Sequence, residues 1–101
     1  EAQIDWQQSA IEIDRMIRAF DAYPTAFTLY KGEALRFFSS SVVPNAHHNA
    51  QPGSVLAESK AGIDIATGNG VVRIHSLQLP GGKRLSVPEF LNGRSLIGEQ
   101  F

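Results

Sequence analysis

Residues 63–79 read IDIATGNGVVRIHSLQL and predict a β-hairpin whose second strand is irregular. Asn69-Gly70 stands between two short apolar runs, and Asn-Gly in that setting is the strongest local signal for a β-hairpin. In the second run the apolar residues change phase, from even positions before His75 to odd positions after Ser76. A one-residue bulge there would bring the apolar residues of the run onto one buried face. These residues are Val72, Ile74, Leu77 and Leu79.

Short apolar runs on either side of this stretch extend the same pattern. They predict strands over 26–30, 35–38 continuing through 43, 53–57, 63–66 and 71–79. Ser9 and Glu12 form a capping box that starts a helix reaching residue 20, and Trp6 ahead of it is expected to pack in the core. Ser86 and Glu89 form a second capping box. The order helix, five strands, helix predicts a mainly β fold with flanking helices, specifically a small five-stranded OB-like barrel.

Composition bounds the class of protein. The 101 residues are 43% hydrophobic and 19% charged, which predicts one packed, soluble domain over 1–101. The chain has no cysteine, so disulfide scaffolds, thiol nucleophiles and cysteine-based zinc sites are excluded. The net charge of -1 is uneven. Residues 1–33 carry three basic and six acidic side chains, whereas residues 34–101 carry six basic and four acidic ones.

The residues that could carry chemistry form no enzyme constellation. His47, His48 and His75 lack acidic neighbours at metal-ligand spacing, so a solvated loop and an ordinary strand position are the better interpretations. The glycine-rich residues 67–70 join two strands and open no helix, so they predict a turn and not a phosphate cradle. The remaining candidate is a group of cations that could grip phosphate, two of them just before a helix start. These are Lys83, Arg84, Arg94 and Arg73.

Short motifs along nearly the whole chain, in order, resemble the C-terminal domain of the methionyl-tRNA formyltransferase family. They are Ile4-Asp5-Trp6, residues 17–20 (IRAF), Tyr23-Pro24, residues 51–56 (QPGSVL), 66–70 (ATGNG), 76–79 (SLQL), 82–85 (GKRL) and 90–93 (FLNG). The resemblance implies an OB-like barrel. It also implies a parent enzyme that transfers a formyl group from 10-formyltetrahydrofolate to methionyl initiator tRNA in the cytoplasm.

The same resemblance implies a division of labour. The family's catalytic asparagine, histidine and aspartate and its folate site belong to an N-terminal Rossmann-like domain, which is absent from this chain. No catalytic, cofactor-binding or metal-binding residue is therefore expected here, and no membrane partner. The expected partners are the N-terminal catalytic domain and the acceptor arm of initiator tRNA, whose phosphates Lys83, Arg84, Arg94 and Arg73 would contact. The net charge of -1 departs from the basic surface of the family.

Two other functions stay open at this stage. The same domain type follows the catalytic domain in other folate-dependent and in sugar-nucleotide formyltransferases, where it would be a structural element that binds no nucleic acid. A free-standing interaction module is the third class. Phe37, Phe38 and Tyr30 could stack on nucleotide bases, but the strand pattern favours a place in the core for them.

Overall fold

The computed structural model describes residues 2–21 and 24–101. Within these ranges the helices are α1 (Ala10–Ala19) and α2 (Val87–Phe90). The strands are β1 (Ala2–Gln3), β2 (Ala26–Tyr30), β3 (Glu33–Val42), β4 (Val55–Ser59), β5 (Gly62–Ala66), β6 (Val71–Gln78) and β7 (Leu85–Ser86). The mainly β class and the two helices are thus confirmed, and β1 and β7 are additional short strands.

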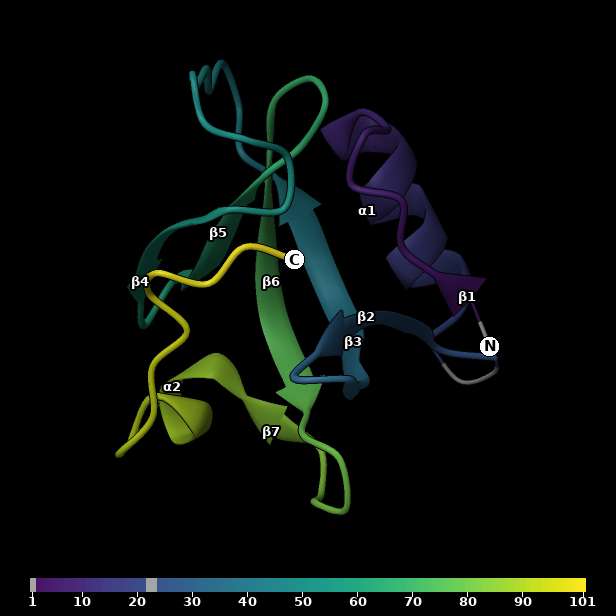
Figure 1. Ribbon diagram of the computed structural model, residues 1–101, viewed down its shortest axis with the longest axis vertical. Helices are drawn as coiled ribbons and strands as arrows, with labels where there is room; N and C mark the ends of the chain where they lie inside the picture. The colour runs from purple at the N-terminus through teal and green to yellow at the C-terminus, as the bar shows by residue number, and fades with distance from the viewer. Residues whose placement is uncertain (1, 22–23) are drawn as a thin grey trace.

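The strands form one open, mixed sheet. Its order is β1-β2-β3-β6-β5-β4, and β7 pairs with the end of β6 (Figure 1). β1 and β2 are parallel, and the other pairs are antiparallel. In the described residues no ladder joins β1 to β4 at the two ends of this order, so the closed barrel expected from the sequence is not shown.

The predicted irregularity in the central strand is confirmed. Phe37 pairs with Leu77, Ser39 with Ser76 and Ser40 with Ile74, so the β3–β6 register shifts twice. One residue on each strand has no partner in the β3–β6 ladder: Phe38 on β3 and His75 on β6. The shifts keep Val72, Ile74 and Leu77 fully buried. Leu79 is only half-buried, because Pro80 follows it and β6 ends at Gln78.

The helix α1 covers part of the sheet as its sequence pattern predicts. Its capping box is formed, with Ser9 Oγ accepting the Glu12 N–H, and Ile13 and Ile17 are fully buried. The buried carboxylate of Asp14 accepts from Ser40 Oγ on β3 at 2.7 Å and pairs with Arg18 at 3.0 Å. The predicted helix end at residues 21–24 cannot be followed in full, because Ala22 and Tyr23 lie outside the described residues.

The Asn-Gly turn docks on the start of α1. The Gly68 N–H donates to the Trp6 carbonyl at 2.8 Å, and the Ala10 N–H donates to the Asn69 carbonyl at 2.9 Å. Trp6 is buried, as predicted, and its Nε1–H donates to Thr28 Oγ1 at 3.0 Å. These contacts tie the N-terminal segment, the β5–β6 turn and β2 together.

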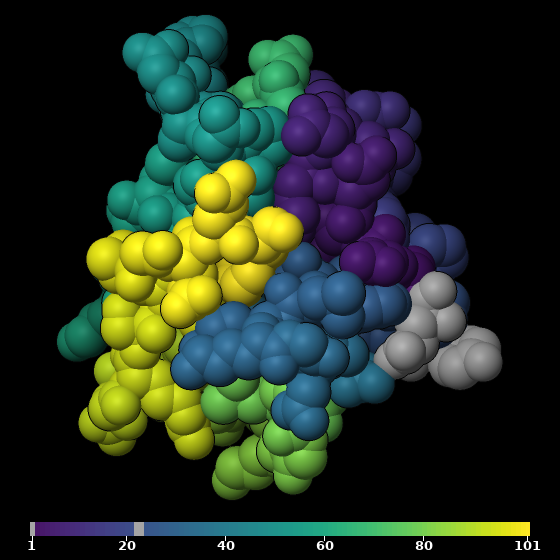
Figure 2. Space-filling model, in the orientation of Figure 1, coloured from purple at the N-terminus to yellow at the C-terminus, as the bar shows by residue number. Residues whose placement is uncertain are grey.

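The C-terminal segment lies between β4 and the β2–β3 hairpin. The Phe101 N–H donates to the Gly53 carbonyl at 2.8 Å, and Glu58 accepts from Ser95 Oγ and the Leu96 N–H. The Phe101 ring packs at 6.2 Å from Trp6 and Tyr30 and 6.5 Å from Phe37 between centroids. In Figure 2 this yellow segment fills the surface between the teal residues around β4 and the blue β2–β3 hairpin.

Candidate nucleic-acid interface

The turn between β6 and β7 holds Lys83 and Arg84 at the surface. Its backbone is fixed, because the Gly82 N–H donates to the Leu79 carbonyl at 3.0 Å and the Gln78 side-chain amide donates to the Gly82 carbonyl at 2.7 Å. Gly81 has a φ of +74°, a conformation that glycine adopts without strain. Both cations are exposed and directly precede β7, which is paired with β6.

Arg84 is held by two side chains from distant parts of the sequence. Its guanidinium carbon lies 4.4 Å from the centroid of the Phe38 ring, and its Nη1 lies 3.2 Å from Asp21 Oδ1. The ion pair is half-exposed, with 50% of the Arg84 side chain and 47% of the Asp21 side chain accessible. Part of the charge of Arg84 is therefore already balanced by the protein.

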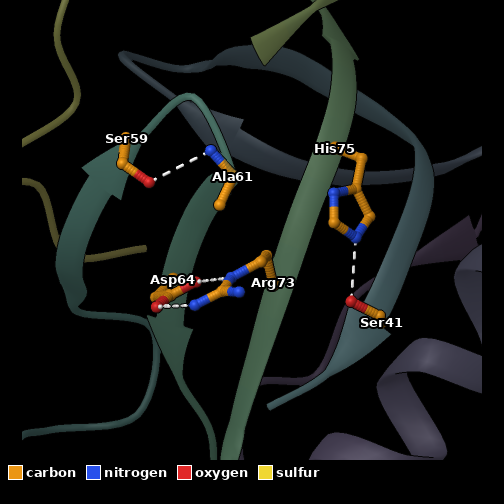
Figure 3. A network of polar contacts seen from close by, with 6 residues as sticks. All are labelled: Ser41, Ser59, Ala61, Asp64, Arg73 and His75. Atoms are coloured by element: carbon orange, nitrogen blue, oxygen red, sulfur yellow. Dashed lines mark hydrogen bonds and ion pairs between the residues drawn. The ribbon is translucent and has the colours of Figure 1, made fainter. Parts of the chain in front are cut away.

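Arg73 forms the tightest ion pair among these cations. From β6 it donates to both carboxylate oxygens of Asp64 on β5, through Nε at 2.7 Å and through Nη2 at 3.0 Å (Figure 3). These hydrogen bonds, and then the charge of Asp64, raise the pKa of Arg73 above its usual value. The stem of Arg73 lies against Gly62, where a Cβ atom would overlap it. The side chain of Arg73 is therefore fixed in position by Asp64, which also balances most of its charge.

Lys83 and Arg94 differ from the other two. Arg94 is exposed and lies over the Phe90 ring at 5.7 Å. In the part of the chain that the structure describes, neither Lys83 nor Arg94 has a carboxylate partner within ion-pair distance. Lys83 still contributes a small part to the lowered pKa of Glu89. These two side chains have the least balanced charges of the four.

The four cations do not form a single cluster. Lys83 and Arg84 are adjacent, and Arg84 precedes Leu85, which pairs with Leu77. Arg73 precedes Leu77 by four residues on β6, which is roughly 13 Å along the strand. Arg94 follows α2, which Figure 1 shows on the other side of β7 from the β6–β7 turn. Lys83 and Arg84 therefore lie just before β7, Arg94 lies after α2, and Arg73 lies farther up β6.

The start of α2 is occupied by the protein itself. Ser86 Oγ accepts the Glu89 N–H, and the Glu89 carboxylate accepts the Ser86 N–H at 2.9 Å, as the capping box predicts. The backbone hydrogen bond to Ser86 is the main cause of the lowered pKa of Glu89. A carboxylate therefore already occupies the helix start that the sequence offered to a phosphate.

His48 and His75 make structural hydrogen bonds, and His47 is exposed. His48 Nδ1 accepts the Ala50 N–H at 3.1 Å, so Nε2 carries the proton that it donates to the Thr67 carbonyl at 2.8 Å. His75 Nε2 lies 2.8 Å from Ser41 Oγ on β3 (Figure 3). Over residues 2–21 and 24–101, no three acidic or histidine side chains come together in a way that could hold a metal ion. The helices in those ranges are all too short to span a membrane.

The ion pair of Arg73 could have been predicted from the sequence. The loop 67–70 pairs Ala66 with Val71, and counting outward from that pair sets Asp64 opposite Arg73. The contacts of Arg84 have no comparable signal, because Asp21 and Phe38 are brought to it only by the tertiary fold.

A family comparison decides which domain this is. The model described as "Formyl transferase, C-terminal domain" matches residues 1–95. This chain belongs to the formyl transferase C-terminal domain family. The resemblance found in its sequence motifs is thereby confirmed.

Relatives of this formyl transferase C-terminal domain carry informative names. It is 48% identical over 102 residues to the methionyl-tRNA formyltransferase of Variovorax paradoxus, covering 100% of this chain and 32% of that protein. It is 44% identical over 92 residues to the methionyl-tRNA formyltransferase of Coxiella burnetii, covering 91% of this chain and 29% of that protein. The chain therefore spans about a third of the length of these curated relatives.

The fold also matches a solved structure. HypX from Aquifex aeolicus in complex with tetrahydrofolic acid contains a region that aligns with a TM-score of 0.67 and 26% sequence identity. The alignment covers 90% of this chain and 17% of the HypX chain. The region of HypX that this chain matches is thus a small part of that larger protein.

Proposed function

We propose that this chain is the tRNA-binding and tRNA-positioning C-terminal domain of a methionyl-tRNA formyltransferase. The observation that carries the proposal is the 48% identity, over the whole chain, to a protein of that name. In the proposed enzyme a formyl group passes from 10-formyltetrahydrofolate to the amino group of methionyl initiator tRNA. The enzyme acts in the cytoplasm.

In this proposal the chemistry belongs to a catalytic N-terminal domain, which also holds the folate donor. The present chain, as a single domain, would supply neither a cofactor site nor a catalytic group. Their part is to hold the acceptor arm of the tRNA so that the methionyl amino group reaches the catalytic domain. Holding a reactant in the productive geometry accelerates a reaction without any change in its chemistry.

The tRNA would be held by Lys83, Arg84, Arg94 and Arg73, in unequal shares. Lys83 and Arg94 are exposed and lack a carboxylate partner in the described part of the chain, so they are proposed to take the phosphate contacts. Arg73 and Arg84 already hold Asp64 and Asp21, and a phosphate would have to displace a carboxylate from them. Contacts of this kind supply affinity through released counterions and read no sequence.

We also propose that the sheet belongs to the OB-like class, with the C-terminal segment in place of a closing ladder. The proposal is supported by the position of the C-terminal segment between β4 and the β2–β3 hairpin. Ser54 and Gln100 form an isolated antiparallel bridge there, and the Phe101 ring packs on Trp6, Tyr30 and Phe37. On this view the C-terminal segment closes the gap in the sheet, through this backbone bridge and through the packing of Phe101.

A second candidate function is a structural C-terminal domain of another folate-dependent or sugar-nucleotide formyltransferase, with no nucleic acid bound. The likeness to HypX and the net charge of -1 favour it. The two functions differ in one observable property. The tRNA-binding domain binds tRNA at low salt, and the structural domain does not.

The experiment is a fluorescence-anisotropy titration of labelled initiator and elongator tRNAs with the 101-residue chain at low ionic strength. We expect weak binding with little preference between the two tRNAs, because phosphate contacts carry no sequence information. A signal that stays at baseline for both tRNAs contradicts the proposal and supports the structural function.

A further inference from the structure

An aromatic ring lies at the surface beside the bulge in β3. Phe37 pairs with Leu77 and is fully buried, and the next paired residue is Ser39. Phe38 between them has no partner in the ladder and is only half-buried. Successive residues of a strand point to opposite faces, so Phe38 is on the face away from the core.

Arg84 is fixed on this ring. The hydrogen-bonded turn before it and the pairing of Leu85 with Leu77 after it set its backbone. Phe38 lies beneath its guanidinium at 4.4 Å, and Asp21 holds one of its nitrogens at 3.2 Å. Half of the side chain remains accessible. A planar cation is thus presented at the surface in one orientation, before any ligand is bound.

The ion pair with Asp21 makes this site a poor one for phosphate. A phosphate approaching the guanidinium edge meets the Asp21 carboxylate and is repelled by it. The face of the guanidinium is different, because stacking on it needs no net charge. Unpaired nucleotide bases stack on aromatic rings and on arginine planes, and tRNA carries unpaired nucleotides at its 3′ end.

We propose that Arg84, supported by Phe38, is a stacking platform for the base of an unpaired nucleotide. The inference rests on the proposed function, in which this chain binds tRNA, and it gives Arg84 a role separate from phosphate contact. Arg84 then favours single-stranded RNA over duplex, which Lys83 and Arg94 do not.

The other cation–ring contacts of the described residues lack these properties. Arg94 lies farther from its ring, at 5.7 Å, and Phe90 is almost completely buried. Lys31 lies over Tyr30 at 5.2 Å, but an ammonium group has no plane on which a base can stack. The control for Arg84 is Arg15, an exposed arginine on α1 that is not among the proposed tRNA contacts.

The first experiment compares Arg84→Lys with Arg15→Lys, since both variants keep their charge. Each is titrated against a short single-stranded RNA and against a blunt-ended RNA duplex with the same number of phosphates. Arg84→Lys should weaken single-strand binding roughly tenfold, within the range of a single base stack. Its affinity for the duplex and both affinities of Arg15→Lys should stay within twofold of wild type.

Three outcomes separate the two proposals. Wild-type binding of both probes together with the selective loss in Arg84→Lys supports the platform. Wild-type binding of both probes with no loss, or with equal losses on the two probes, overturns the platform and leaves the proposed function standing. No wild-type binding to either probe overturns the proposed function and the platform with it.

A second measurement does not depend on RNA affinity. The Nε–Hε signal of Arg84 is followed by NMR while adenosine or inorganic phosphate is added to the chain. The platform predicts a ring-current shift of this signal with adenosine and none with phosphate. In Phe38→Leu, whose melting temperature is checked first, the adenosine shift should shrink. A signal that moves with phosphate and not with adenosine contradicts the proposal.

Discussion

Gly68 lies so close to Gln7 that a Cβ atom on Gly68 would overlap the carbonyl oxygen of Gln7. The Gly68 N–H also donates to the carbonyls of Trp6 at 2.8 Å and Gln8 at 2.9 Å. The Asn-Gly turn is therefore more than the end of a hairpin. It is the point where the sheet meets the N-terminal segment and the start of α1.

The Gly68→Ala substitution should lower the free energy of unfolding by about 2–4 kcal/mol, because the new methyl group meets backbone that cannot easily move aside. Gly82→Ala is the matched control, since a Cβ there would make only an ordinary contact of 3.4 Å with the Leu79 carbonyl. Urea denaturation of both variants measures the difference. Equal stability of the two variants would show that the turn does not dock as described.

Leu77 and Gln78 test the inner and outer faces of β6. Leu77 is fully buried, so Leu77→Ala should cost about 2–5 kcal/mol of folding free energy. Gln78 makes one exposed hydrogen bond to the Gly82 carbonyl, so Gln78→Ala should cost about 1 kcal/mol or less. Thermal or urea unfolding of the two variants gives the comparison. Small, equal effects would mean that the faces of the strand are assigned wrongly.

The capping box of α1 makes stability depend on pH. The hydrogen bond from the Ser9 backbone N–H is the main cause of the lowered pKa of Glu12. A folded-state pKa below the unfolded one means that the unfolded chain binds more protons. The stabilisation is therefore present above the ordinary glutamate pKa of about 4.3 and is lost as the pH falls through the lower, folded-state pKa.

Glu12→Gln should consequently lose less melting temperature than wild type when the pH is lowered from about 6 to about 3. Glutamine can still accept the hydrogen bond, but it does not titrate. Circular dichroism melts across this range give the result. Glu89 has the same arrangement at α2, so Glu89→Gln should behave likewise. Parallel curves for wild type and Glu12→Gln would contradict the assignment.

The division of labour predicts that the 101-residue chain has no formyltransferase activity of its own. Incubation with 10-formyltetrahydrofolate and methionyl-tRNA should yield no formylated product above a buffer blank, because the proposed catalytic groups belong to another domain. Activity that persists through repurification and gel filtration with this chain would place the chemistry here and overturn that division.

The local elements of the fold could be predicted from the sequence because their signals are local. The capping boxes at Ser9 and Ser86 mark the two helix starts, and the phase change around His75 marks the bulge. β1 and β7 could not be predicted, since two residues show no periodicity. The position of Phe101 could not be predicted either, because its packing against Trp6 follows from the tertiary fold alone.

The contacts of the candidate site were harder to predict, because most of them join residues that are far apart in the sequence. The sequence identifies Lys83, Arg84, Arg94 and Arg73 as cations, but it indicates a counterion for only one of them. The Asp64–Arg73 pair follows from the hairpin register, whereas Asp21 is 63 residues away from Arg84 in sequence. Whether the four residues contact tRNA stays a prediction, and the ion pairs change how much each is expected to contribute.

Phosphate contact by Lys83 and Arg94 is the central claim about binding, and the salt dependence of tRNA affinity tests it most directly. The slope of log K against log salt is measured by anisotropy for wild type and for two double variants. Lys83→Ala with Arg94→Ala removes the proposed contacts. Arg15→Ala with Lys31→Ala removes two exposed cations from the N-terminal third and changes the net charge equally.

Each lost phosphate contact on a duplex reduces the slope by about 0.9. The account predicts that the Lys83 and Arg94 double variant has a slope shallower by up to about two units, equally for initiator and elongator tRNA. The Arg15 and Lys31 double variant should keep the wild-type slope. Slopes that are unchanged in the first variant, or reduced equally in both, would contradict the account.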